Sequence, residues 1–138
     1  SGTITAKKYL WVQCFTDPSA NSTAQWRVNS DSGSNYSERF STDGGADSTN
    51  TSGSVMNIGN TTATPSFSNT FIINNSANEK LFINNWVGGN TAGAGTATMK
   101  RKGVGKWSNT SSQITSLQNI LPAGVHNSNS IMKVWGSN

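Results

Sequence analysis

The side chains that could carry acid–base or metal chemistry are few and scattered in this sequence. His126, the single histidine, stands in the segment AGVHNSNS, where it could act as a general base or bind a metal ion. Zinc sites combine several Cys and His ligands, and the one cysteine, Cys14, has no such spacing to His126. We therefore interpret His126 as a solvated loop residue.

The carboxylates also lack the pairing that general acid–base catalysis requires. Most of them stand beside Ser or Gly in segments typical of turns, where Asp commonly bonds to nearby backbone. The oxygen-rich segments at 29–35 and 43–47 resemble calcium loops, but neither has the EF-hand spacing or a bidentate Glu. The sequence thus predicts no catalytic residue, no cofactor, no metal and no enzyme activity. The carboxylates are Asp17, Asp31, Glu38, Asp43, Asp47 and Glu79.

A basic cluster beside a tryptophan, MKRKGVGKW at 99–107, is a candidate binding surface. Cations and an aromatic ring together can bind single-stranded nucleic acid through phosphate contacts and base stacking. Lysines that protect a strand edge give the same pattern, and we favour an edge or assembly contact over nucleic acid. A phosphate-binding loop is not predicted, because Trp107 follows Lys106 and no helix is expected next. The expected assembly contacts are Lys7, Lys8, Lys100, Arg101 and Lys102.

The five tryptophans suggest either a sugar-binding platform or large core residues. We predict that most of them fill the core of a small sandwich. Trp86 is the expected exception, because NNWVGG sets it beside Asn84 and Asn85, whose amides could bond to sugar hydroxyls. A glycan contact through these three residues, with loops 41–54 and 88–95, is therefore the alternative to an assembly contact.

The composition favours one domain, spanning residues 1–138, made of strands and tight turns. Hydrophobic residues make up 33% of the 138 and charged residues only 12%, which is not the highly charged signature of disorder. Ser, Thr and Asn supply about two residues in five, a composition that favours strands and turns over helices. The net charge of +4 favours acidic or phosphate-rich partners. No run approaches the roughly 18 apolar residues of a membrane span, and residues 1–15 lack a signal-peptide segment, so no membrane partner is expected.

Apolar residues alternate with period 2 in short runs separated by turn formers. This pattern predicts an all-β, antiparallel β-sandwich, jelly-roll-like, with eight or nine short strands and no helix. In 9–15 both alternating faces are apolar, which is typical of a strand covered on both sides. Segment 41–54 is predicted to be a long exposed loop, and Gly103 and Gly105 to mark a bulge or bend. The predicted strands are 9–15, 24–29, 36–40, 54–60, 66–75, 79–89, 96–107, 112–120 and 130–136, with 66–75 and 79–89 forming a hairpin.

The C-terminal segment GKWSNTSSQITSLQNILPAGVHNSNSIMKVWG, residues 105–136, carries a family resemblance. It resembles the closing hairpin of small jelly-roll modules in virion proteins of tailed bacteriophages, and 26–40 is similar to an Arg-strand, Ser-Gly turn and Tyr strand of those modules. Trp135 stands where Tyr is common, and Pro122 lies in a turn that often lacks it. The matching positions are Gly105, Trp107, Asn109, Thr110, Ile114, Thr115, Ser116, Leu117, Gly124, Ile131, Val134, Trp135 and Gly136.

The resemblance implies a structural component of the virion rather than an enzyme. We expect a capsid decoration or cement protein, assembled in the host cytoplasm, whose partners are capsid or other virion proteins. The chain is expected to form a homo-oligomer, with a trimer as the working guess, and its basic residues to meet an acidic lattice surface. The alternative is a carbohydrate- or receptor-binding appendage of the tail-fibre type, with a glycan as the partner.

Overall fold

The computed structural model describes residues 2–89 and 93–138, and it confirms an antiparallel β-sandwich. No helix forms within the described residues. Ten strands form there, one more than the longest count expected from the sequence. They are β1 (Tyr9–Thr16), β2 (Ser22–Val28), β3 (Tyr36–Thr42), β4 (Ser48–Gly53), β5 (Met56–Thr62), β6 (Ser66–Ile73), β7 (Lys80–Gly88), β8 (Met99–Trp107), β9 (Leu117–Ile120) and β10 (Ile131–Ser137).

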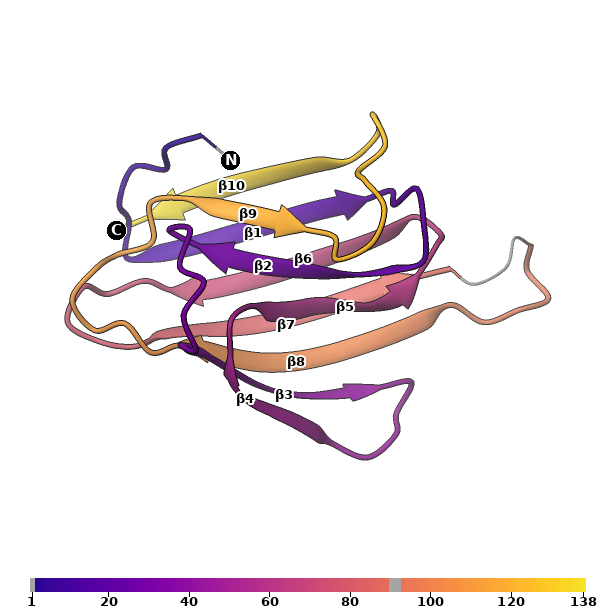
Figure 1. The fold of residues 1–138 in the computed structure, drawn as a ribbon, viewed down its shortest axis with the longest axis horizontal. Coiled ribbons are helices and arrows are strands. Elements are labelled where there is room, and N and C mark those ends of the chain that lie inside the picture. The colour runs from indigo at the N-terminus through magenta and orange to yellow at the C-terminus, as the bar shows by residue number, and fades with distance from the viewer. Residues whose placement is uncertain (1, 90–92) are drawn as a thin grey trace.

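The strands divide unequally between two sheets. The larger sheet has seven strands in the order β10-β1-β6-β7-β8-β3-β4, and the smaller has three in the order β5-β2-β9. In Figure 1 the smaller sheet lies in front of the larger one, and β3 and β4 extend beyond it at one edge. The predicted hairpin of 66–75 with 79–89 is confirmed, because β6 pairs with β7 in antiparallel register. Because the small sheet covers one face of the large sheet, the other face is left as an outer surface.

Alternation along the strands places one side chain in two between the sheets. On β2 Trp26 and Val28 are fully buried, while on β1 Leu10 and Val12 point inward. Burying side chains of this size is the main favourable term in folding so polar a chain. The core cluster consists of Leu10, Val12, Cys14, Ala24, Trp26, Val28, Tyr36, Met56, Ile58, Ile72, Phe82, Trp107, Ile114 and Leu117.

Segment 41–54 is not the long loop predicted from the sequence. It contains the end of β3 and the whole of β4, which pair in register with Arg39 opposite Thr49. Nearly every side chain of β4 is exposed, so no apolar alternation marks it in the sequence. Backbone pairing at the edge of the sheet, rather than apolar packing, holds this strand.

The glycines of β8 do not produce the predicted bulge. The pairing of β8 with β3 and with β7 runs without a register shift past Gly103 and Gly105. A Cβ atom on Gly105 would lie 2.6 Å from the Sδ atom of Met56. Glycine is therefore needed there because the buried Met56 side chain packs directly against the β8 backbone.

The predicted closing hairpin within 105–136 is also wrong. β9 pairs with β2 in the small sheet, whereas β10 pairs with β1 in the large sheet. Asparagine side chains hold the segment before β9 in place of strand pairing. Asn74 donates to the Ile114 carbonyl at 3.2 Å and accepts from the Ile114 N–H at 2.6 Å, and Asn29 Oδ1 accepts from Thr115 N–H at 2.8 Å. These amides satisfy backbone groups that a sheet would otherwise pair.

Candidate association surface

The outer face of the large sheet carries an apolar surface. Its large apolar side chains are between 37% and 57% exposed, and they come from five neighbouring strands. A soluble monomer rarely exposes so many such residues side by side, and larger patches mark interaction sites. The eleven residues, called here the outer face, are Tyr9, Trp11, Phe67, Phe71, Ile73, Leu81, Ile83, Val87, Val104, Ile131 and Trp135.

The register of the strands arranges these side chains in rows across the sheet. Trp11 is paired with Trp135 on one side and with Phe71 on the other. Phe71 is paired with Ile83, and Ile83 with Val104, so one apolar row crosses five strands. The Trp11 and Phe71 rings are stacked, with centroids 5.9 Å apart, and the Trp11 and Trp135 centroids are 4.9 Å apart. This row is called the central row.

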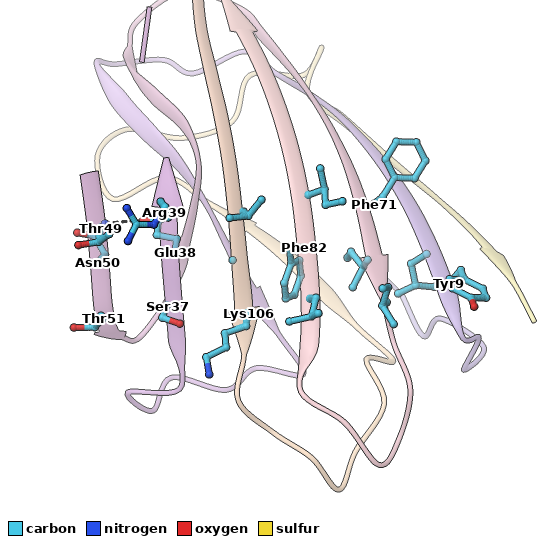
Figure 2. Close-up of a pocket in the computed structure, with 17 residues that line it drawn as sticks. Tyr9, Ser37, Glu38, Arg39, Thr49, Asn50, Thr51, Phe71, Phe82 and Lys106 are labelled. Atoms are coloured by element: carbon cyan, nitrogen blue, oxygen red, sulfur yellow. Dashed lines mark hydrogen bonds between the residues drawn. The ribbon is translucent and has the colours of Figure 1, made fainter. Parts of the chain in front are cut away.

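A second apolar row, from Tyr9 to Leu81, borders a groove in the outer face. The groove has a volume of about 550 Å³ and crosses β6, β7 and β8. Tyr9 and Phe71 lie at one side of it, and Arg39 and Thr49 lie at the other (Figure 2). Its polar lining groups come mainly from β3, β4 and Lys106 of β8, whereas its lining on β6 and β7 is apolar.

The charged side chains around the outer face include two exposed ion pairs. Lys106 Nζ lies 2.8 Å from Glu79 Oε2, and Arg39 Nη1 lies 3.6 Å from Asp47 Oδ2. Exposed pairs of this kind contribute little stability, but each locally neutralises its charge. Lys100 and Lys102 also project from β8 toward solvent. The apolar surface therefore has a mildly basic margin.

The structure does not bring the predicted assembly residues together. Arg101 is buried on the inner face of β8, so it is not available as an assembly contact. Lys100 and Lys102 are exposed near the start of β8, whereas Lys7 and Lys8 precede β1. The register places the start of β1 level with the end of β8, so these two lysine pairs lie at opposite ends of the sheet. Charge alone, on which this prediction was based, does not specify the face or the end of the sheet that a residue occupies.

Arg101 instead forms a buried ion pair with Glu38. The Arg101 Nη2 and Glu38 Oε2 atoms are 3.1 Å apart, and both side chains are 5% exposed. Nη1 of Arg101 donates to the Gly59 carbonyl, and its guanidinium group stacks on Phe40 at 3.4 Å from the ring centroid. Burial lowers the pKa of Arg101, and the charge of Glu38 opposes that effect. This pair is part of the core between the sheets.

The predicted glycan platform is not at the surface. Trp86 is 4% exposed, and its ring lies over Gly59 and Gly88, where an added Cβ would meet indole atoms at 2.7 and 2.5 Å. Asn84 is also buried, where its amide bonds to Thr70 and to the Ile58 carbonyl. Only Asn85 is exposed. Of loop 88–95, residues 90–92 lie outside the described residues.

Two exposed tryptophans, Trp11 and Trp135, were missed as surface residues. The signal was present in the alternation of 9–15, where both faces are apolar but the core accepts only Leu10, Val12 and Cys14. These tryptophans do not make a good sugar site, because sugars need converging polar groups beside the ring. The nearby side-chain oxygen Oδ1 of Asn69 already accepts a hydrogen bond from the Trp11 indole N–H. The second face of this strand is thus apolar and exposed.

The oxygen-rich turns use their carboxylates within the fold. Asp31 accepts hydrogen bonds from Trp107 Nε1 at 2.6 Å, Gly33 N–H at 2.8 Å and Asn35 Nδ2 at 2.9 Å. The bond from Trp107 is the main reason that the pKa of Asp31 lies below its ordinary value of 3.8. Within the described residues no three His, Cys, Asp or Glu side chains gather as metal ligands. His126 Nε2 lies 3.1 Å from the Asn119 carbonyl.

Asp31→Asn is expected to destabilise the protein by about 1–2 kcal/mol near neutral pH, because an amide cannot accept all of these bonds. The folded pKa is lower than the unfolded one, so the carboxylate contributes stability above the unfolded pKa of about 4 and loses it as the pH falls through the folded pKa. The difference in the free energy of unfolding between wild type and Asp31→Asn should therefore become smaller at acidic pH. Urea denaturation at several pH values measures it. Asp47→Asn, at an exposed pair, is the control, and an equal pH dependence there would contradict the assignment.

Comparison with protein-family models, curated proteins and solved structures finds no match to this chain. The fold itself therefore defines the class: an antiparallel β-sandwich of a seven-stranded and a three-stranded sheet. Within the described residues, no helix is long and apolar enough to cross a membrane.

Proposed function

We propose that this chain is a structural subunit of a tailed-bacteriophage virion, where it decorates or cements the capsid lattice. The observation that carries the proposal is the outer face, an apolar surface of five strands that is exposed in the isolated chain. Apolar surface of this extent is stabilised by contact with another protein surface. A protein that works by such contacts needs no reactive side chains.

The virion part of the proposal rests on the resemblance of residues 105–136 to phage jelly-roll modules. In the structure, several positions that carry the resemblance are core residues: Trp107, Ile114 and Leu117 are buried. Their burial agrees with the use of this pattern to build a sandwich rather than a reactive site. The location on a capsid follows from the resemblance alone.

Decoration of a lattice would work through repetition. Each copy would make modest neutral hydrogen bonds and a few apolar contacts. Because the symmetry of the lattice repeats these contacts, their combined strength would hold the chain in place through avidity. Lys8 is exposed and precedes β1, outside the outer face, so it is available to meet an acidic lattice. Raising the salt concentration should weaken that electrostatic part of the attachment while leaving the apolar part intact.

Gold-labelled antibodies against the purified chain test the proposal on phage particles whose genome encodes this sequence. We expect electron microscopy to show label distributed over the heads, and antibody pre-absorbed with the purified chain to give none. Label confined to tail fibres would instead support the appendage alternative. Intact particles that carry no label would overturn the proposal.

A further inference from the structure

We propose that the outer face binds a second copy of this chain, sheet against sheet, about a two-fold axis parallel to the strands between β6 and β7. The inference rests on the proposed structural role and names the partner of its apolar surface. Two copies related in this way use the same residues on both sides, as in other isologous dimers.

The size of the outer face matches what a stable dimer needs. At about 200 Å² for a fully exposed side chain, eleven roughly half-exposed residues present on the order of 1,000 Å² of surface. A standard stable interface buries about 800 Å² per partner, and apolar interfaces are typical of permanent homodimers. The largest apolar patch of an ordinary monomer is smaller, about 300–600 Å².

The shape of the outer face is complementary to itself. All of its aromatic residues lie on β10, β1 and β6, whereas β7 and β8 contribute only Leu, Ile and Val. The proposed axis places β6 over β7 of the other copy and β1 over β8, so large side chains face smaller ones. The groove over β7 and β8 would then receive aromatic rings from the partner. Packed sheets keep their strand directions within about 30° of each other, which this arrangement satisfies.

Under this axis each row of one copy faces the same row of the other copy. A rotation about an axis parallel to the strands does not change the position of a residue along the strand direction. In the central row, Phe71 would lie over Ile83 and Trp11 over Val104 of the other copy. Trp135 would lie over Arg39, which continues the row beyond Val104. A guanidinium group over an indole ring is a favourable contact.

The polar side chains fit the same arrangement. One row of the face is polar, and in it Asn69 is paired with Asn85, so the axis would place amide over amide. The exposed β8 lysines would face uncharged residues of β1: Lys106 would meet Tyr9, Lys102 would meet Gln13, and Lys100 would meet Phe15. No cation meets another cation. Lys100 and Lys106 stand near the two ends of β8, where their ammonium groups can extend to solvent, and the Gln13 side chain can accept a hydrogen bond from Lys102. An isologous contact closes after two copies, which replaces the trimer expected from the sequence.

Sedimentation velocity over a concentration series tests the dimer. We expect the wild-type chain to sediment as two copies and Ile83→Lys to raise the dimer Kd at least about 100-fold, because each dimer would bury two unpaired ammonium groups. Val125→Lys is the matched control: Val125 is 65% exposed but lies in the loop between β9 and β10, so this variant should remain dimeric. Circular dichroism and thermal unfolding confirm that both variants fold.

A cross-link locates the axis independently of any loss of folding. Asn85 lies on β7 beside the proposed axis, and packed sheets are about 10 Å apart, so a bis-maleimide of about that length should join Asn85→Cys into a dimer. Val125→Cys should give none at the same protein concentration. The native Cys14 is buried and should not react.

A wild-type monomer at high micromolar concentration would overturn the inference, and so would a trimer, an Ile83→Lys dimer or an Asn85→Cys chain that fails to cross-link. A chain that is monomeric in solution, together with antibody label on phage heads, would contradict the dimer alone. It would indicate that a lattice protein covers the outer face. A chain that is dimeric in solution, together with phage heads that carry no label, would contradict the virion proposal alone.

Discussion

Arg101→Met is expected to lower the free energy of unfolding by about 3–5 kcal/mol, because removing one member of a buried ion pair leaves the other charge uncompensated. Here the group left behind is the Glu38 carboxylate, which lies 3.1 Å from Arg101 Nη2. The Gly59 carbonyl would lose its donor as well, and Phe40 would lose the stacked guanidinium group. Glu38 would keep the amide donors Asn50 and Asn57, each 2.6 Å from Oε1, but the buried carboxylate would have no countercharge.

Urea denaturation of matched variants measures this effect. Arg39→Met is the control, because Arg39 also forms an ion pair but with its side chain 60% exposed, and its loss should cost less than about 1 kcal/mol. Adding Glu38→Gln to Arg101→Met should recover part of the lost stability, because the buried charge is removed. Equal losses for Arg101→Met and Arg39→Met would contradict a buried pair.

The position of Arg101 shows that a cluster of basic residues in the sequence does not indicate which of them are exposed. In the sequence it stands in a basic cluster, and its partners Glu38, Phe40 and Gly59 come from β3 and β5, more than forty residues earlier. Period-2 alternation could have separated it from its neighbours, because Trp107 was a predicted core residue and Arg101 lies six positions before it on the same face of β8. The partners themselves could not be predicted, since they depend on which strands become neighbours.

The predictable strands are those in which apolar residues recur with period 2, whether that apolar side is buried or lies on the outer face. The runs that became β1, β2 and β7 bury large apolar residues on the inner face, whereas β6 has only Ile72 there and its other apolar residues point outward. All four were predicted near their observed bounds. β4 was missed because its side chains are polar and mostly exposed, and it is held by backbone pairing with β3 and by the bond from Asn50 to Glu38. β9 is shorter than predicted because Ile114 is held by the Asn74 side chain rather than by a strand.

The sequence indicates that residues 9–15 are apolar on both faces, but it does not indicate that one of these faces belongs to a larger exposed surface. Residues 9–15 are apolar on both faces, which predicts a cover on each side of the strand. The three-stranded sheet supplies one cover, and Trp11 on the other side is 39% exposed. Only the strand order shows that Trp11, Phe71 and Ile83 belong to one row, so the surface emerges from pairings that a single sequence does not specify.

Trp26→Ala is the second substitution with a large expected effect, a loss of about 3–5 kcal/mol in the free energy of unfolding. Trp26 is fully buried on β2, the central strand of the three-stranded sheet, between β5 and β9. Truncation would open a large cavity, and a sheet of only three strands has few side chains that could fill it.

Trp26→Phe keeps an aromatic ring in the core and is therefore the control for this prediction. Within the described residues Trp26 Nε1 has no hydrogen-bond partner, so the indole carries a buried donor that contributes no bond. Phenylalanine keeps most of the packing and removes that donor, so we expect a loss below about 1.5 kcal/mol in urea denaturation. A Phe variant as unstable as the Ala variant would contradict the assignment of the large loss to the cavity that truncation opens.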